Sequence, residues 1–203
     1  MLNLPNSAVI PQPLLNRLNT VLATSRDKEW DRQTTDVEQF KNAVMVQGLV
    51  IQNNRCVWCG LLTGIVGHQR ADRDHIAPKN KYPQWTFEPK NIAISCEFCN
   101  CFSVKEELDT VLTVAGSYST SVFRIVHPYL QNPALHLTFG FKNNGAGVTV
   151  KGTTVIGIWT VRNMKLDSPS LTTRRAMEVL FLQQFSSLPQ HLKELALSAS
   201  AKL

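Results

Sequence analysis

Residues 73–100 read RDHIAPKNKYPQWTFEPKNIAISCEFCN, and this stretch decides which fold we expect. It begins with an Asp-His pair and ends with a Cys-x-x-Cys pair that an asparagine follows directly. A second pair of this kind, CVWC, lies upstream at residues 56–59. Each pair presents two thiolates to one tetrahedral ion, so two pairs supply the four ligands of a closed structural zinc site. The predicted zinc ligands are Cys56, Cys59, Cys96 and Cys99.

The composition is typical of a globular protein with a moderate excess of positive charge. Hydrophobic residues make up 43% of the chain, and the formal net charge of +6 suits an anionic partner such as nucleic acid. No apolar run approaches the roughly 20 residues that cross a bilayer, and we find no signal-peptide pattern. We therefore expect no membrane partner and a cytoplasmic location, where paired cysteines bind metal rather than form disulfides. The fifth cysteine, Cys101, is expected to be a small buried hydrophobe.

Hydrophobic periodicity and chain breakers indicate three regions, a helical one over residues 1–52, a metal-binding core over 53–110 and an α+β region over 111–203. The expected helices span residues 13–24, 29–50, 100–112 with Ser103 as its cap, and two stretches between about 170 and 198 that separate near SSLPQ. The expected strands are a hairpin over 61–72 with Gly64 and Gly67 at its turn, a strand ending near Ile76, and strands over 121–126, 135–141 and 147–161.

A second site is expected in the loop that the zinc ion closes, because a closed zinc site leaves no position for a substrate. The carboxylate of Asp74 and the amide oxygen of Asn100 suit a hard divalent cation such as Mg²⁺ or Mn²⁺. The imidazole of His75 beside that ion would take a proton from an attacking water, and Asn91 would orient it by a hydrogen bond to Nδ1. In a regular strand Asp74 and His75 point to opposite faces.

This order of residues resembles the HNH endonuclease family. The resemblance covers residues 56–105: CxxC, then Asp-His-Ile with a proline three residues after the histidine, then an asparagine, then CxxC-Asn and a lysine. It implies a treble-clef-like ββα-metal core, stapled by zinc, that cuts DNA phosphodiester bonds with one divalent ion. It also implies that His75 is the general base, that Asn91 is the central asparagine, and that Asp74 and Asn100 bind the ion. Many members have a histidine at the position of Asn100, and a subset has asparagine.

The flanking sequence is similar to the HNH proteins of Septu-type anti-phage systems and their retron-linked relatives. The similarity rests on HIAPKNKYP, on the segment from Asn91 to Asn100, and on VHPYLQNPALHLTFGF further along the chain. It implies an effector of anti-phage defence that acts beside an ATPase partner.

Basic residues crowd the motif and recur in residues 138–177, which hold six lysines and arginines against one acidic residue. A cluster of this kind favours DNA as the partner, although a solvated face is the commoner role of any single lysine. The residues expected to contact DNA are Arg73, Lys79, Lys81, Lys105, Arg174 and Arg175.

Other conspicuous residues are expected to have structural roles. His127 and His136 lie far from the motif in sequence, and His68 falls in the exposed hairpin. Trp58 and Trp85 are expected to pack around the cysteine knuckles rather than stack on bases.

Two alternative functions remain open at this stage. A non-catalytic zinc-finger module that binds DNA has the same cysteines and basic stretch, but no use for Asp74, His75, Asn91 and Asn100 together. An interaction subunit would be active only in complex with a partner ATPase. An RNA substrate is also compatible with the sequence.

Overall fold

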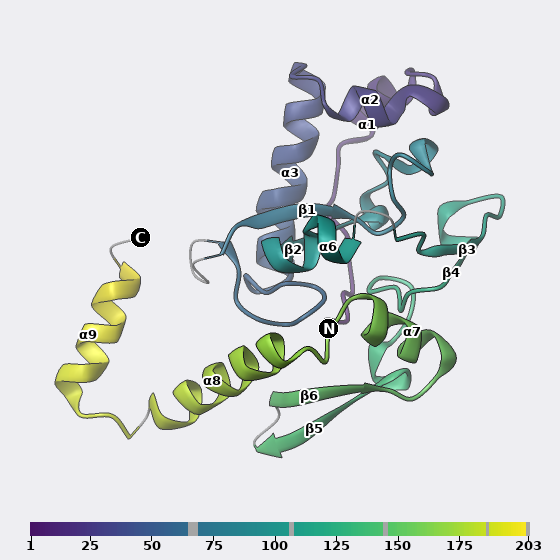
Figure 1. The fold of residues 1–203 in the computed structure, drawn as a ribbon. Coiled ribbons are helices and arrows are strands. Elements are labelled where there is room, and N and C mark those ends of the chain that lie inside the picture. The colour runs from purple at the N-terminus through teal and green to yellow at the C-terminus, as the bar shows by residue number, and fades with distance from the viewer. Residues whose placement is uncertain (65–68, 106–107, 144–145, 186, 202–203) are drawn as a thin grey trace.

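The computed structural model describes residues 1–64, 69–105, 108–143, 146–185 and 187–201 (Figure 1). These residues combine helices with three two-stranded antiparallel sheets, so the expected α+β class is confirmed. In Figure 1 the N-terminal helices lie at the top, the first hairpin lies at the centre, and the two C-terminal helices extend to one side.

The N-terminal region contains helices α1 (Gln12–Asn19), α2 (Arg26–Trp30) and α3 (Thr35–Ile51). The first expected helix ends early because the guanidinium of Arg26 donates hydrogen bonds to the carbonyls of Asn19 and Val21, which holds the intervening segment in a turn. The second expected helix is divided into α2 and α3. Trp30 at the end of α2 packs edge-on against Phe40 of α3, with ring centroids 6.2 Å apart, so the two pieces pack together.

The central hairpin pairs strands β1 (Ala71–His75) and β2 (Ile92–Cys96). The register is regular, with Asp74 opposite Ala93 and His75 opposite Ile92. The sequence predicted a strand that ends near Ile76, and β1 ends one residue earlier. Asp74 and His75 therefore lie on opposite faces of β1, as strand alternation requires.

Two short helices follow the hairpin, α5 (Glu97–Asn100) and α6 (Phe102–Lys105). The expected helix over 100–112 is confirmed only over residues 102–105, because Cys101 has an extended backbone (φ −72°, ψ 160°) that separates α5 from α6. Residues 106 and 107 of the expected helix lie outside the described residues. Ser103 lies inside α6 and does not cap it. The end of the expected helix is instead a strand.

The C-terminal region contains β3 (Val111–Thr113) paired with β4 (Val122–Phe123), β5 (Leu137–Asn143) paired with β6 (Ala146–Gly152), and helices α7 (Val155–Asn163), α8 (Pro169–Phe185) and α9 (Gln190–Ala201). The expected pair of C-terminal helices, separated near SSLPQ, is confirmed. The expected strand over 147–161 is wrong in its second half, which forms α7. The hydroxyl of Thr154 accepts a hydrogen bond from the backbone N–H of Gly157 and begins this helix.

The expected hairpin over 61–72 is described only in part. Gly64 and Gln69 form an isolated antiparallel bridge, and Gly64 has a positive φ of 70°, as a turn glycine can. Gly67 and His68 lie outside the described residues.

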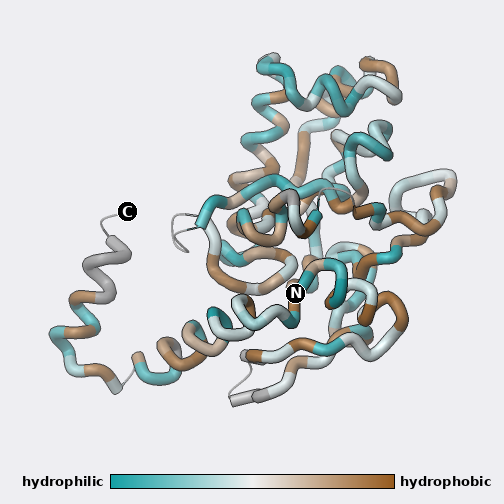
Figure 2. Tube along the Cα trace, viewed as in Figure 1, coloured by the Kyte–Doolittle hydropathy of each residue, from teal (hydrophilic) through white to brown (hydrophobic). Residues whose placement is uncertain are grey.

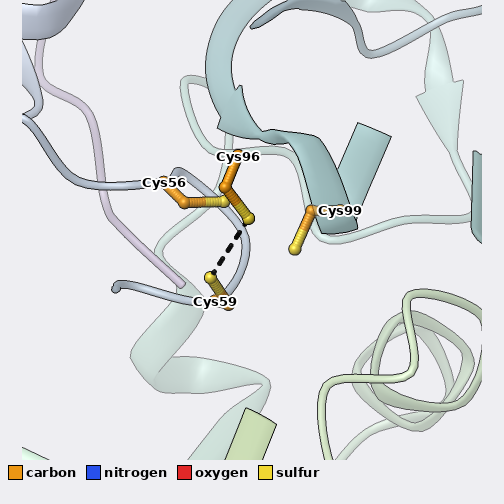
Figure 3. Close-up of side chains that lie close together, drawn as sticks. All are labelled: Cys56, Cys59, Cys96 and Cys99. Atoms are coloured by element: carbon orange, nitrogen blue, oxygen red, sulfur yellow. Dashed lines mark hydrogen bonds between the residues drawn. The ribbon is translucent and has the colours of Figure 1, made fainter. Parts of the chain in front are cut away.

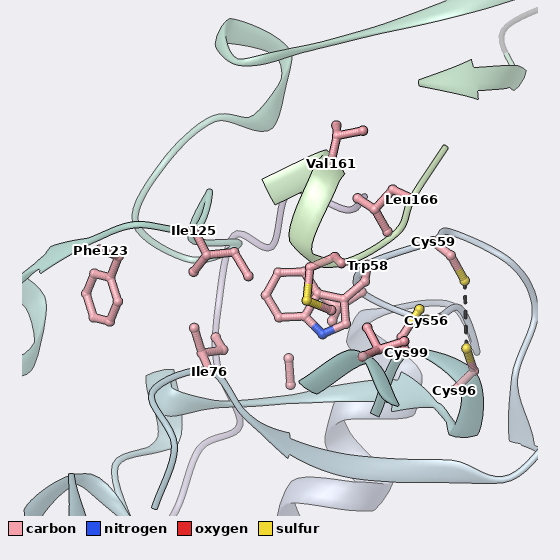
Figure 4. Close-up of a cluster of buried hydrophobic side chains, with 14 of the residues drawn as sticks. Cys56, Trp58, Cys59, Ile76, Cys96, Cys99, Phe123, Ile125, Val161 and Leu166 are labelled. Carbon is pink, nitrogen blue, oxygen red and sulfur yellow. Dashed lines mark hydrogen bonds between the residues drawn. The ribbon is translucent and has the colours of Figure 1, made fainter. Parts of the chain in front are cut away.

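Strand β2 separates two clusters of buried side chains. Ile92 and Ile94 pack into a helical cluster with α1, α2 and α3. Ala93 and Cys96 pack into a larger cluster that contains the four buried cysteines and is called the cysteine-side cluster. The cysteine-side cluster reaches from Leu4 to Leu171 and draws residues from all three expected regions. Figure 4 shows part of this cluster around Trp58. The boundaries near residues 52 and 110 stay predictions. The helical cluster consists of Ala8, Ile10, Leu14, Leu18, Trp30, Val37, Phe40, Val44, Phe87, Ile92 and Ile94.

Hydrophobic and hydrophilic residues alternate along α3 and α8 (Figure 2). In the part of the chain that the structure describes, no helix combines the length and the apolar character that crossing a membrane requires.

Replacing Gly157 with alanine is expected to lower the free energy of unfolding by about 3 kcal/mol, the upper end for an overpacked site. A Cβ atom at this position would overlap the carbonyl oxygen of His136, which is backbone and cannot rotate away. Urea unfolding followed by circular dichroism measures the change. Gly116→Ala is the matched control, because its Cβ would meet open space. Equal unfolding midpoints for the two variants would contradict the prediction.

Candidate metal centre and adjoining pocket

Four cysteine thiols form a buried cluster (Figure 3). Cys56 and Cys59 come from the knuckle after α3, Cys96 ends β2, and Cys99 lies in α5. The four sulfur atoms lie within 4.8 Å of one another, and those of Cys59 and Cys96 are 3.8 Å apart. All four are free thiols. The predicted cysteines therefore form one group that can hold a structural metal ion.

The geometry and electrostatics of this group fit zinc. Sulfur ligands at about 2.3 Å from a tetrahedral zinc ion lie about 3.8 Å from one another. Burial raises the pKa of the Cys56 thiol, whereas hydrogen bonds from the other thiols, led by Cys56, lower the pKa of Cys96. Four adjacent thiolates repel one another unless a cation binds them, and a zinc ion would supply the charge that offsets this repulsion.

The first knuckle is fixed to the central hairpin by backbone hydrogen bonds. The N–H of Cys56 donates to Leu61 at 2.9 Å, and the N–H of Val57 donates to Ile94 of β2 at 3.0 Å. Gly60 closes the turn with a positive φ of 77°. Behind the knuckle, the buried ring of Trp58 packs between the cysteines and the side of the core that contains Ile125 (Figure 4). The metal centre and β2 thus form one unit.

An open pocket of about 530 Å³ lies at the carboxyl end of β1. It brings together three of the four predicted site residues, Asp74, His75 and Asn100, whereas Asn91 is not among its lining residues. Asp74 and His75 both reach the pocket, although they occupy opposite faces of β1, because the pocket lies where the strand ends. Its other lining residues are Trp30, Arg73, Pro78, Lys79, Asn80 and Lys105.

The imidazole of His75 is held in one tautomer. Its Nε2 lies 3.0 Å from the carbonyl oxygen of Thr86, which can only accept, so Nε2 carries the proton and Nδ1 keeps its lone pair. The ring also packs edge-on against Trp30, with centroids 4.5 Å apart. Burial lowers the pKa of His75 to about 4, so the ring is neutral at pH 7.

The carboxylate of Asp74 is 1% exposed and is hydrogen-bonded on both oxygens. Oδ2 accepts from the indole N–H of Trp58 at 2.5 Å, and Oδ1 accepts from the ammonium of Lys105 at 2.5 Å. Lys105 also donates to the carbonyl of His75 and lies 5.0 Å above the ring of Trp58. A buried carboxylate needs such partners, and here one of them is a cation.

Asn100, the last residue of α5, also lines the pocket. Its Nδ2 donates a weak hydrogen bond of 3.4 Å to Asp72. Within the described residues its amide oxygen accepts no hydrogen bond, so this oxygen is available to a cation.

The expected contact of Asn91 with His75 is not present in the structure. The Asn91 side chain is fully buried, and its Oδ1 accepts from the N–H of Ala77 at 2.7 Å. Its Nδ2 donates to the carbonyls of Ala77 and Trp85 at 3.2 and 2.9 Å. Asn91 therefore joins Ala77 and Trp85 of the loop after β1. The carbonyl of Thr86, and not Asn91, orients His75.

The predicted DNA-contacting residues divide into two groups. Arg73 and Lys79 line the pocket, Lys79 pairs with Asp31 at 2.9 Å, and Lys81 and Arg174 are exposed. These four stay candidates for contacts with an anionic partner.

Burial corrects the expectation for the other two residues. Lys105 is 7% exposed and is engaged by Asp74, so it is part of the pocket wall and not of a surface patch. Arg175 is 6% exposed, and its guanidinium donates to the carbonyls of Leu166 and Leu171. Its guanidinium is directed into the fold, because the helix that carries it packs against the core.

The remaining predicted structural residues lie in packed positions. His136 Nδ1 lies 2.9 Å from the hydroxyl of Thr154, and the ring of Trp85 stacks on Tyr82 with centroids 5.3 Å apart. Trp58 is buried beside the cysteines, but its indole N–H also holds Asp74. Cys101 is only partly buried, because it lies in the extended link between α5 and α6.

The sequence did not predict three features of the pocket and of His75 beside it. The carbonyl of Thr86 is a backbone group and leaves no signal in the residue type. Trp30 comes from an N-terminal helix more than 40 positions before His75, so only the fold places it there. The ion pair of Lys105 with Asp74 had a possible signal, a lysine in the short helix after the second knuckle.

No family model matches the chain, and a search of curated proteins finds no match.

Proposed function

We propose that the chain is a metal-dependent endonuclease of the HNH type that hydrolyses phosphodiester bonds in DNA. The observation that carries the proposal is the state of His75. Its Nε2–H is donated to Thr86, its Nδ1 forms no hydrogen bond with the described residues, and it shares a pocket with the carboxylate of Asp74 and the amide of Asn100. A neutral, oriented imidazole beside hard oxygen ligands is the arrangement that a general base in metal-assisted hydrolysis requires.

The expected ββα-metal core is part of the proposal. The hairpin β1–β2, the helices α5 and α6, and the four-cysteine group occur in the order that such a core requires. The candidate base lies at the end of β1, and a candidate metal ligand lies in the helix that follows β2.

Asp74 and Asn100 are the residues that would hold the catalytic Mg²⁺ or Mn²⁺. Their oxygen atoms suit a hard cation, and Asp74 already has a cationic partner in Lys105. A bound ion would stabilise the negative charge that develops on the phosphate. Because both oxygens of Asp74 are hydrogen-bonded, a cation held by Asp74 would compete with the ammonium of Lys105 for this carboxylate.

His75 would act on the attacking water. As the water oxygen bonds to phosphorus and the bond to the leaving oxygen breaks, Nδ1 accepts the proton of the water. The leaving oxygen takes a proton from solvent. The low pKa of His75 keeps the base unprotonated at pH 7, and an adjacent phosphate would raise this pKa toward the range in which a base is more effective.

DNA is the proposed substrate because the chain carries a net charge of +6 and because Arg73 and Lys79 line the pocket. A role as a cytoplasmic anti-phage effector beside an ATPase partner rests on the resemblance in sequence.

A plasmid-nicking assay tests the function. Wild-type protein is expected to nick supercoiled DNA with Mg²⁺ or Mn²⁺ and not with EDTA. His75→Ala is expected to lower the rate by about 10²–10⁴-fold, the usual contribution of a general base, while the zinc content and circular dichroism spectrum are retained. His191→Ala is the matched control, since His191 is exposed on α9.

Nicking by His75→Ala at the wild-type rate would overturn the mechanism. DNA binding without cleavage in either metal would favour the zinc-finger module. Cleavage only after an ATPase is added would favour the interaction subunit.

A further inference from the structure

A network of buried hydrogen bonds links the C-terminal region to the loop after β1. Tyr118 O–H donates to Asn91 Oδ1 at 2.9 Å, and the same hydroxyl oxygen lies 2.8 Å from His127 Nε2. The N–H of Tyr129 donates to His127 Nδ1 at 3.2 Å. Tyr118, His127 and Asn91 are almost completely buried, so water does not replace these bonds.

The donor and the acceptor can be assigned for every hydrogen bond of this network. His127 Nδ1 accepts from a backbone N–H, so the proton of the neutral ring is on Nε2 and is donated to Tyr118. The single hydroxyl proton of Tyr118 is then donated to Asn91 Oδ1, which also accepts from the N–H of Ala77. Burial lowers the pKa of His127 to about 3, which agrees with a neutral ring.

The last hydrogen bond of this network lies one peptide unit from the contact that orients His75. Asn91 donates to the carbonyl of Trp85, and the next carbonyl, that of Thr86, accepts from His75 Nε2. The ring of Tyr118 also packs edge-on against Trp85, with centroids 5.1 Å apart. Tyr118 thus contacts both the residue that clamps the loop and the residue before the orienting carbonyl.

We propose that Tyr118 and His127 are positioning residues for His75, acting through Asn91 on the loop that presents the carbonyl of Thr86. The inference rests on the proposed function, because it gives His75 a catalytic role. It assigns part of the active-site preorganisation to residues more than 40 positions beyond the motif histidine. A misplacement of a catalytic group by about 1 Å can lower the rate about 10²-fold, so smaller displacements are expected to lower kcat while KM changes little.

The test compares Tyr118→Phe with Tyr82→Phe. The first variant keeps the aromatic ring but removes the hydroxyl from the network. The second removes a hydroxyl from the loop after β1, where it donates to Asp109 at 2.9 Å, and leaves the bonds of Asn91 intact. Tyr118→Phe is expected to lower kcat about tenfold with KM for DNA within about twofold. Tyr82→Phe is expected to leave kcat unchanged.

A second pair of variants tests the histidine and includes rescue. His127→Leu is expected to lower kcat as Tyr118→Phe does, whereas His127→Gln, whose amide N–H can donate to Tyr118, is expected to restore most of it. Zinc content and thermal melting verify that each variant is folded at the assay temperature.

Nitrogen-15 NMR of the histidine rings provides a readout that does not need activity. The resonances of His75, assigned by their loss in His75→Ala, are expected to report the Nε2–H tautomer in the wild type and a mixture of tautomers in Tyr118→Phe. An unchanged kcat and tautomer in Tyr118→Phe, or an equal fall of kcat in Tyr82→Phe, would overturn the inference. If the wild-type protein cleaves no DNA, the proposed function fails, and the tautomer comparison alone still decides whether Tyr118 positions His75.

Discussion

The Cys99→Ser variant is expected to lose its structural metal and to unfold at temperatures at which the wild-type protein is stable. Cys99 is one of four buried sulfur atoms within 4.8 Å of one another, and serine is not a zinc ligand at neutral pH. Structural zinc contributes roughly 10–16 kcal/mol in small zinc-binding domains, which exceeds the total stability of most domains. We expect the melting temperature to fall by more than about 15 °C. Elemental analysis of bound zinc and thermal melting by circular dichroism measure both effects.

The chain supplies a matched control in Cys101→Ser. Cys101 lies two residues after Cys99 but outside the cluster and only partly buried, so its substitution is expected to change stability by less than about 0.5 kcal/mol. A Cys99→Ser protein that retains one equivalent of zinc and has the melting temperature of the wild type would contradict the assignment of the ligands.

The Lys105→Met variant is expected to lower the free energy of unfolding by about 3–5 kcal/mol, because it leaves a buried charge without its partner. The ammonium of Lys105 lies 2.5 Å from Oδ1 of Asp74, and the two side chains are 8% and 1% exposed. Methionine retains the length of the aliphatic stem that packs near Trp58, so the change isolates the charge. Guanidinium unfolding in EDTA-free buffer with saturating zinc measures it.

Two controls make this result specific. Lys79→Met removes an ion pair with Asp31 whose carboxylate is 68% exposed, and the expected change is below about 1 kcal/mol. In a double-mutant cycle, the variant that combines Asp74→Asn with Lys105→Met is expected to lose much less free energy of unfolding than the two single variants lose in sum. Additive losses would show that the two charges do not depend on each other.

The cysteine spacing predicted the four-cysteine group because four thiolates around one ion leave few alternatives. The structure also brings the predicted site residues Asp74, His75 and Asn100 to one pocket, whereas their roles in binding a cation and in catalysis stay predictions. The role of Asn91 was wrong in detail because its partners, the backbone of Ala77 and the carbonyl of Trp85, have no residue signature.

The other errors have a common cause in local sequence that fits two structures. The β-branched run that ends near residue 161 suits a strand, and only the cap of Thr154 and the approach of Gly157 to His136 favour a helix. Arg175 belongs to a basic stretch by sequence, but its turn of α8 directs it into the core. Charge counts do not distinguish such an arginine from its exposed neighbour Arg174.

Because β2 lies between two clusters, its two faces become buried at different times while the chain is being synthesised. A ribosome adds roughly 5–20 residues per second, starting from the N-terminus. The helical cluster has all its buried side chains once Ile94 has emerged, but the cysteine-side cluster is complete only when Leu171 has emerged. That interval is 77 residues (171 − 94), or roughly 4–15 seconds at those rates. A nascent chain thus closes one face of β2 well before the other, and for those seconds its unfinished face is available to chaperones.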